Sequence, residues 1–143
     1  MNIGLNLETA VFLGGVTHLG ILSAGAVMTK VLNWKTELTK LNDLSRHIIW
    51  THGGYVWLTI LAFGLVSVFF PEHLVSNHPL GIAISGFIAI FWGIRLFIQF
   101  FGFDAKPHLS NYWLKLGFHG LTLTFAYFTL VYGGAVWNGW LNS

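Results

Sequence analysis

Four long runs of apolar residues occupy most of the chain, and short polar stretches separate them. We place these runs at about 8–29, 46–70, 80–103 and 112–138. A helix needs about 20 mostly apolar residues to cross a hydrocarbon core of roughly 30 Å, and each run meets that length. Because backbone in lipid must satisfy its own hydrogen bonds, we expect the runs to be helices rather than strands. The sequence predicts an all-α integral membrane protein, a single domain over residues 1–143 in which four transmembrane helices form a compact bundle.

The composition supports this prediction and removes several classes of function. Of the 143 residues, 55% are hydrophobic and only 8% are charged, whereas about a quarter of the residues of a soluble domain are charged. The chain has no cysteine, which excludes disulfides, thiolate metal sites and iron–sulfur clusters. Seven Lys and Arg against five acids are too few for a nucleic-acid-binding face. The expected partners are the lipid bilayer and either further copies of the chain or another membrane protein.

The basic residues predict how the chain is oriented in the membrane. Six of the seven lie in or next to the loops that join the first run to the second and the third to the fourth: Lys30, Lys35, Lys40, Arg46, Lys106 and Lys115. By the positive-inside rule these two loops are expected to be cytoplasmic and both termini periplasmic, in a bacterial-type inner membrane. The first run is not expected to be a signal peptide, because no basic residue precedes it and it is longer than a typical signal sequence.

The loops carry two further signals. Residues 30–44 place Trp34, Leu38 and Leu41 at helical spacing with charges between them, which is typical of a short helix lying on the membrane surface; a plain connector anchored by Trp34 is the alternative. Pro71 and Pro79 bracket the outer loop, and they predict where the second span ends and the third begins.

Each run also carries a stripe of small and polar residues at helical spacing, and such residues mark the faces on which membrane helices pack. We expect these stripes to face the inside of the bundle. Their members, in chain order, are Gly14, Gly15, His18, Leu22 and Gly25; Ser45, His52, Thr59 and Val66; Gly81, Ser85, Ile88, Trp92, Arg95, Gln99 and Gly102; and Tyr112, Lys115, His119, Thr122, Ala126, Thr129 and Gly133.

Ionisable and amide side chains within the runs are the candidate functional residues. A charge near the bilayer centre costs several kcal/mol unless it is paired or hydrated, and Arg95 is such a residue. At about 1.5 Å of rise per residue, Arg95, Gln99, His52 and His119 fall in one layer within roughly 13 Å of the predicted cytoplasmic ends, and His18 lies about 5 Å deeper. Packing alone does not require this layer.

Two histidines on different spans at similar depth are what a b-type haem needs, because both imidazoles must reach one iron. His52 and His119 fit best, and His18 is the alternative ligand. Arg95 can pair with a haem propionate, and Gln99 lies in the same layer. Small residues beside the two histidines leave room for a flat macrocycle: Gly53, Gly54 and Gly120. The competing interpretation is that the histidines hydrogen-bond across helices and that Arg95 bonds Gln99 or reaches the headgroups.

Other chemistries lack the residues that they need. A carboxylate-bridged di-iron site needs several inward acids, but Glu8 and Asp104 stand only at the ends of runs. A serine hydrolase would lack its acid within the membrane, so the serines of the runs are expected to be helix-interface groups: Ser23, Ser67 and Ser85. Nothing in the spacing of the histidines favours zinc.

Three functions remain open. The first is a small haem b protein that transfers electrons, with His52 and His119 as its metal ligands. The second is a non-catalytic subunit or assembly factor of a larger membrane complex, which small size and the lack of an acid–base constellation favour over the first. The third is a homo-oligomeric anion channel or carrier in which Arg95 lines a water-filled seam.

Overall fold

The computed structural model describes residues 3–102 and 111–143, so Asp104, Lys106 and the last residue of the third predicted run lie outside the described residues. In this part of the chain every regular element is a helix. The elements are α1 (Ile3–Val31), α2 (Trp34–Leu38), α3 (Asp43–Phe69), α4 (Pro71–Val75), α5 (Pro79–Phe97), a π-helical turn η1 (Ile98–Gly102) and α6 (Tyr112–Leu141).

Four of these helices are long and apolar enough to cross a membrane. Their spans are Asn6–Val31, Asp43–Phe69, Pro79–Gly102 and Tyr112–Leu141, each within a few residues of a predicted run. The prediction of an integral membrane protein built from four transmembrane helices is therefore confirmed.

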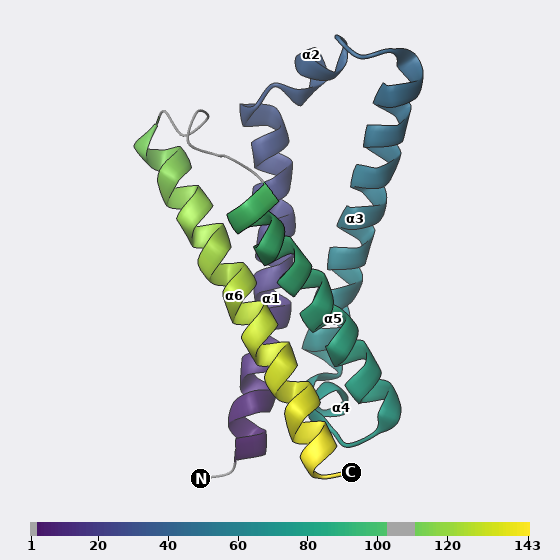
Figure 1. The fold of residues 1–143 in the computed structure, drawn as a ribbon, viewed down its shortest axis with the longest axis vertical. Coiled ribbons are helices and arrows are strands. Elements are labelled where there is room, and N and C mark those ends of the chain that lie inside the picture. The colour runs from purple at the N-terminus through teal and green to yellow at the C-terminus, as the bar shows by residue number, and fades with distance from the viewer. Residues whose placement is uncertain (1–2, 103–110) are drawn as a thin grey trace.

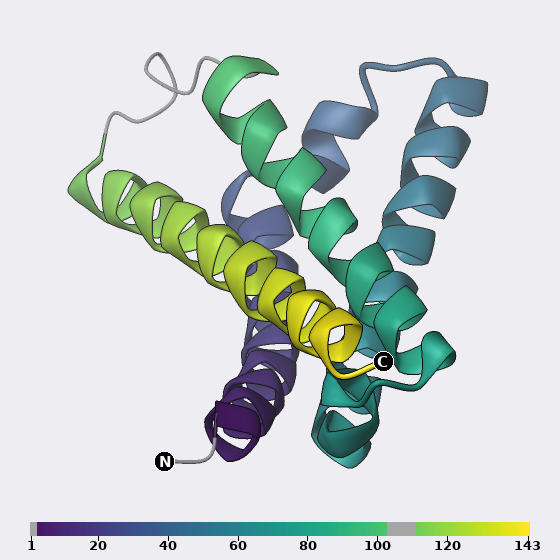
Figure 2. The ribbon, with the colours of Figure 1, turned by 60° about the horizontal axis from the view of Figure 1, so that its bottom comes forward.

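The four long helices do not pack evenly along their length. α1 packs on α3 and α6, and α5 packs on α6. The helices converge at the end that holds α4, whereas α3 and α6 spread to opposite sides at the end that holds α2, as both views of the ribbon show (Figures 1 and 2). The molecule is therefore a bundle that opens toward one end.

We call the two parts the packed half and the open half. The packed half comprises α4 together with residues 6–22, 60–69, 79–93 and 125–141, and it contains every buried hydrophobic side chain of the described residues. The open half comprises α2, η1 and residues 23–31, 43–59, 94–97 and 112–124. Gln99 is the one buried side chain among the described residues of the open half.

α4 closes the packed half from below. Its residues Leu74 and Val75 are buried, and their carbonyls accept hydrogen bonds from two of the long helices. Ser85 Oγ donates to the Leu74 carbonyl at 2.8 Å, and Asn138 Nδ2 donates to the Val75 carbonyl at 3.1 Å. The predicted proline boundaries are correct, since α4 begins at Pro71 and α5 at Pro79. The inward fold of the loop between them was not predicted.

α1 and α3 approach closely through glycines. A Cβ on Gly15 would lie 2.9 Å from the Gly64 carbonyl oxygen, and a Cβ on Gly64 would lie 3.3 Å from the Gly15 carbonyl oxygen. In lipid the hydrophobic effect does not drive helices together, so close van der Waals packing of this kind stabilises their association. The prediction that Gly14 and Gly15 face a neighbouring helix is borne out by their burial.

Two of the four predicted stripes are wrong. On α3 the buried residues are Ile60, Phe63, Gly64 and Ser67 in place of the Ser45–Val66 stripe. On α6 they are Phe125, Phe128, Tyr132, Ala135 and Gly139, mostly one position before the predicted stripe. The reason is that large aromatic residues fill the centre of this bundle, so the small and polar residues beside them point elsewhere. On α5 the buried residues are Gly81, Ser85, Ile88 and Trp92, as predicted, and Gln99 of the same stripe is buried in η1. Three other members of the predicted stripes are exposed: Arg95, Gly102 and, on α1, Gly25.

The short helix expected between the first two spans is present as α2, although Leu41 lies beyond its end. Asn33 precedes it with a φ of 51°, a left-handed conformation that asparagine tolerates and that lets the chain turn out of α1. α3 then begins after Asn42, whose side chain accepts a hydrogen bond from the Ser45 N–H at 2.8 Å.

Candidate functional site at the boundary of the two halves

His18 lies at the centre of the packed half and is fully buried. Trp92 Nε1 donates to His18 Nε2 at 2.8 Å, and His18 Nδ1 lies 2.7 Å from the Gly14 carbonyl oxygen. An indole N–H can only donate, so Nε2 must be the unprotonated nitrogen, and Nδ1 carries the proton that it donates to Gly14. Both ring nitrogens are therefore occupied, and His18 has none left for a metal in this conformation.

This arrangement bears out the competing interpretation for His18, a hydrogen bond across helices. Its ring also stacks on Phe128 of α6 with 4.0 Å between centroids, and its edge contacts Phe63 of α3 at 6.0 Å. The imidazole thus touches all three of the other long helices. His18 is therefore a central contact of the packed half.

A column of aromatic rings leads from this centre toward the open half. Trp92 stacks on Phe125 with 4.9 Å between centroids and 22° between planes. The guanidinium carbon of Arg95 lies 5.8 Å from the centroid of the same Phe125 ring, a cation–π distance. Arg95 therefore stands at the end of the column, at the boundary between the two halves.

Arg95 makes no ion pair or hydrogen bond with any residue that the structure describes, and its side chain is exposed. The acids at the α2 end are already paired, Glu37 with Lys40 at 2.7 Å and Asp43 with Arg46. Within residues 3–102 and 111–143 the arginine is thus a cation at membrane depth whose charge is balanced by no carboxylate. Intramembrane charges of this kind mark functional sites.

Gln99 does not bond Arg95 through its amide nitrogen, although the spacing of four residues suggested such a bond. Its Nε2 donates to the Phe118 carbonyl at 3.3 Å and to Thr122 Oγ1, both on α6. Gln99 belongs to η1, and single π-helical turns are frequent at functional sites. Here the turn aims the amide at α6 and ties the upper end of the third span to the fourth.

His52 is exposed on α3 in the open half. Its Nδ1 lies 2.9 Å from the Ile48 carbonyl oxygen, so when Nδ1 carries the proton, Nε2 keeps a free lone pair. A Cβ on either neighbouring glycine, Gly53 or Gly54, would meet nothing within 4 Å. The space that the sequence predicted beside this histidine is present.

His119 is also exposed, on α6, and Gly120 beside it has open space too. The structure does not bring His119 and His52 together, because they lie on the segments of α6 and α3 that spread to opposite sides of the molecule (Figures 1 and 2). No group of three or more His, Asp or Glu side chains that could hold a metal occurs in the part of the chain that the structure describes. The two histidines predicted as haem ligands therefore lie on helices that diverge in this arrangement.

Two tyrosine hydroxyls complete the polar contacts of the packed half, and sequence reasoning missed both. The Ser67 and Tyr132 hydroxyls lie 2.6 Å apart between α3 and α6, and Tyr127 donates to the Ala10 carbonyl at 2.7 Å between α6 and α1. A tyrosine hydroxyl within an apolar run needs a partner, which is the signal that could have identified them. Ser67 and Ser85 are interface groups, as predicted, whereas Ser23 is exposed and bonds within its own helix.

Comparison with protein-family models, with curated proteins and with solved structures finds no match for this chain.

Proposed function

We propose that the protein is a non-catalytic subunit or assembly factor that binds another membrane protein through its open half. One observation carries this proposal: His52, Arg95 and His119 of the open half are exposed at membrane depth, whereas the buried polar side chains of the packed half, His18, Ser67 and Ser85, are all hydrogen-bonded. By helical rise, His52 lies about 14 Å from the start of its span and His119 about 10 Å from the start of its own. Polar groups exposed to lipid at such depths are costly, and a protein partner would remove that cost.

The glycines of the open half support the proposal. Five of them would meet nothing within 4 Å if they carried a Cβ: Gly25, Gly53, Gly54, Gly117 and Gly120. Membrane helices associate through small residues that allow close approach and through side chains that hydrogen-bond across the interface. The open half offers both on α3 and α6, beside His52 and His119.

A matched pair of substitutions on α6 tests the proposal. Gly120 lies in the open half and Gly133 in the packed half, and a Cβ at either position meets nothing within 4 Å, so neither Gly120→Leu nor Gly133→Leu should unfold the chain. The tagged full-length protein is purified from its native membranes in mild detergent, and its stoichiometric companions are identified and quantified. We expect Gly120→Leu to lose the companion at least about tenfold, with Gly133→Leu behaving as wild type.

Three outcomes oppose the proposal. A wild-type protein that elutes as a monomer, with no companion at near-stoichiometric amount, would rule out a subunit role. If Gly120→Leu and Gly133→Leu retain the companion protein equally, the interface does not include this part of α6. A companion that is only a second copy of the chain would replace the subunit role with self-assembly.

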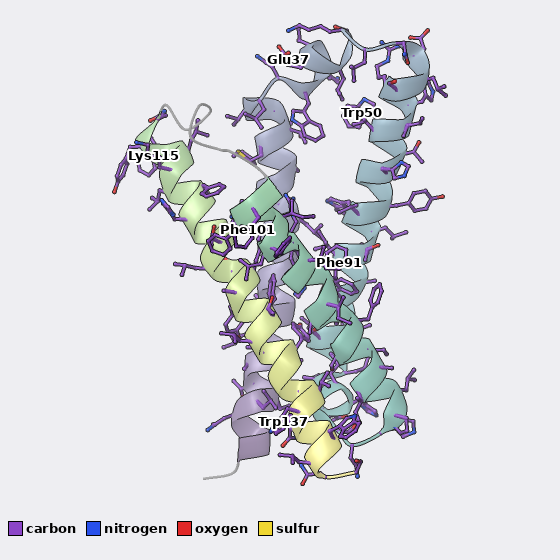
Figure 3. The ribbon with its side chains drawn as sticks, in the orientation of Figure 1. Glu37, Trp50, Phe91, Phe101, Lys115 and Trp137 are labelled. Atoms are coloured by element: carbon purple, nitrogen blue, oxygen red, sulfur yellow. The ribbon has the colours of Figure 1, made fainter. Side chains whose placement is uncertain are left out.

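We also propose that the α2 end of the protein faces the cytoplasm of a bacterial inner membrane. Five of the six described basic residues gather at this end: Lys30, Lys35, Lys40, Arg46 and Lys115. Glu37 and Lys115 mark it in Figure 3, and Trp137 marks the opposite end. A single cysteine introduced at Lys35 should resist a membrane-impermeant thiol reagent in intact cells, whereas one at Asn77 should react. The reverse pattern would invert the topology.

Haem b binding is a second candidate, favoured by the free Nε2 of His52 and the open space at Gly53 and Gly54. Since His18 is occupied and His119 lies on a diverging helix, the second axial ligand would come from another copy of the chain. Such a group would supply one-electron redox chemistry. The side chains of this chain would hold and orient it.

Visible spectra of the purified protein, oxidised and dithionite-reduced, test this candidate. A Soret band with sharp α and β bands on reduction, lost in His52→Ala and present only in the dimeric fraction, would support it. A colourless protein purified from haem-sufficient cells would overturn it, and so would a pigment confined to the monomer.

A further inference from the structure

We propose that the membrane protein bound by the open half contributes a transmembrane helix with an aspartate or glutamate at the depth of Arg95, and that this carboxylate pairs with the arginine. This assignment rests on the proposed function, since it names the chemistry of the partner. Arg95 is exposed on α5 and makes no ion pair with any residue in 3–102 or 111–143. Three features point to a carboxylate of another chain: the depth of the arginine, the direction of its side chain and the positions of the acids.

The depth of Arg95 places its charge within the hydrocarbon core. The third span runs from Pro79 to Gly102, so Arg95 lies 16 residues after its start and seven residues before its end. At about 1.5 Å of rise per residue these distances are roughly 24 Å and 10 Å. Figure 3 labels Phe91, one turn earlier on α5, and Phe101, near the end of the span. An exposed charge at this depth is costly in lipid, and intramembrane charges are stabilised by pairing with an opposite charge.

The side chain of Arg95 is directed toward the packed half and not toward the nearer headgroups. Side chains of a helix lean toward its N-terminus, and the N-terminus of α5 lies in the packed half. The guanidinium carbon lies 5.8 Å from the centroid of the Phe125 ring, on which Trp92 also stacks at 4.9 Å. Gln99, one turn closer to the end of the span, instead donates to Thr122 Oγ1, three residues before Phe125. The charge is therefore held at the level of Phe125, deeper than a headgroup phosphate.

A second copy of the chain cannot supply the carboxylate, because none of the five acids of the sequence lies in the interior of a span. Two of them belong to the short helices α2 and α4, two lie in the first turn of the first and second spans, and one follows the third span, outside the described residues. In this order they are Glu37, Glu72, Glu8, Asp43 and Asp104. Two copies side by side would offer Arg95 no acid at its own depth, so the acid comes from a chain of different sequence.

The surface around Arg95 suits an apolar helix with one acid rather than a water-filled path. The exposed residues next to Arg95 along the chain are large and apolar: Ile94, Phe97 and Ile98. A path for hydrated anions would need polar groups along its wall. A single carboxylate on an apolar helix matches a single cation among apolar side chains, and a guanidinium binds a carboxylate through two parallel N–H···O bonds. The low dielectric of lipid strengthens such a pair.

A synthetic helix tests this chemistry without the native companion. The full chain in mild-detergent micelles is titrated with a fluorescent Leu/Ala transmembrane peptide that carries one aspartate about seven residues from its end, or asparagine at the same position. We expect the wild type to bind the aspartate peptide at least about tenfold more tightly than the asparagine peptide. Arg95→Gln should lose this preference, and Arg95→Lys should keep most of it. Lys115→Gln, which removes an exposed charge near the start of α6, should keep it in full. Helicity by circular dichroism checks that each variant folds.

Reversal of the charge makes the test stricter. Arg95→Glu should prefer a peptide with lysine at the same position over the aspartate peptide. An unchanged preference in Arg95→Gln would overturn the proposal, and an equal loss in Lys115→Gln would do so by assigning the effect to general surface charge. Tighter binding of the aspartate peptide by Asp104→Asn would also overturn it, because Arg95 would then be paired within its own chain.

The companion purified from native membranes separates this assignment from the subunit role. A companion that Arg95→Gln retains and Gly120→Leu loses, with no preference for the aspartate peptide, would leave the subunit role in place and overturn the carboxylate. A preference for the aspartate peptide in a protein without any native companion would support the charge pairing and rule out the subunit role.

Discussion

Separating His18 from Trp92 should destabilise the whole packed half, because their hydrogen bond joins α1 to α5 at its centre. The donor–acceptor distance is 2.8 Å, and His18 and Trp92 are 0% and 2% exposed. Hydrogen bonds between membrane helices average about 0.6 kcal/mol and reach about 1.7 kcal/mol. A short bond between two fully buried partners belongs at the upper end, so we expect a coupling of about 1 to 1.7 kcal/mol.

A double-mutant cycle isolates this coupling from the packing changes that each substitution also causes. His18→Leu leaves the indole N–H without an acceptor, and Trp92→Phe leaves Nε2 without a donor. Each should cost about 2–3 kcal/mol, because an unpaired buried polar group is added to the lost ring contacts. The free energy of unfolding is measured in mixed micelles of rising SDS fraction by circular dichroism.

The double variant decides the outcome. We expect it to lose about 1–1.7 kcal/mol less than the sum of the single losses, since neither partner then remains unpaired. His18→Gln, which retains an acceptor oxygen, should lose less stability than His18→Leu. If the two single losses sum to the loss of the double variant within about 0.5 kcal/mol, the reasoning is refuted, and the histidine contributes by packing alone.

Two further substitutions test the packed half. Gly81→Ala should displace α4 and cost several kcal/mol in the same unfolding assay, because its Cβ would lie 2.0 Å from the His73 carbonyl oxygen. The control Gly54→Ala should be neutral, because a Cβ there meets nothing within 4 Å, and equal losses of stability in the two variants would contradict the described packing. Tyr132→Phe should cost about 0.6–1.7 kcal/mol by removing the 2.6 Å contact with Ser67, and a neutral result would mean that this hydroxyl pair adds nothing.

The spans could be predicted from the sequence because length and hydropathy are properties of each segment alone. Pro71 and Pro79 likewise marked the end of the second span and the start of the third, because proline restricts its own backbone and that of the residue before it. The burial of His18 and Gly15 also followed from local spacing, because they share one face of α1 with Gly14 and Leu22.

The inward faces of α3 and α6 could not be read in the same way. Lipid is as apolar as an aromatic side chain, so hydropathy does not distinguish Phe125 or Phe128 facing the core from a phenylalanine facing lipid. The predicted stripe on α6 therefore fell on Ala126 and Thr129, one position away.

The prediction that two histidines share a haem required two things: similar depths in the membrane and neighbouring helices. Counting residues estimates the depth of a side chain well, but a single sequence does not say which helices lie side by side. His52 and His119 were placed at similar depths by counting residues. The divergence of α3 from α6 in the open half separates them, and the course of the two helices relative to each other is a tertiary feature that residue counting does not give.

Cysteine cross-linking in native membranes tests the opening of the bundle most directly, because the chain has no cysteine of its own. A Cβ at Gly93 lies 3.7 Å from Thr129 Cγ2, so Gly93→Cys with Thr129→Cys should close a disulfide within one chain. His52→Cys with His119→Cys should form no bond within the chain, even with a short bifunctional reagent. Efficient closure of the second pair within a monomer would contradict the account and would bring the two histidines close enough for a single-chain haem site.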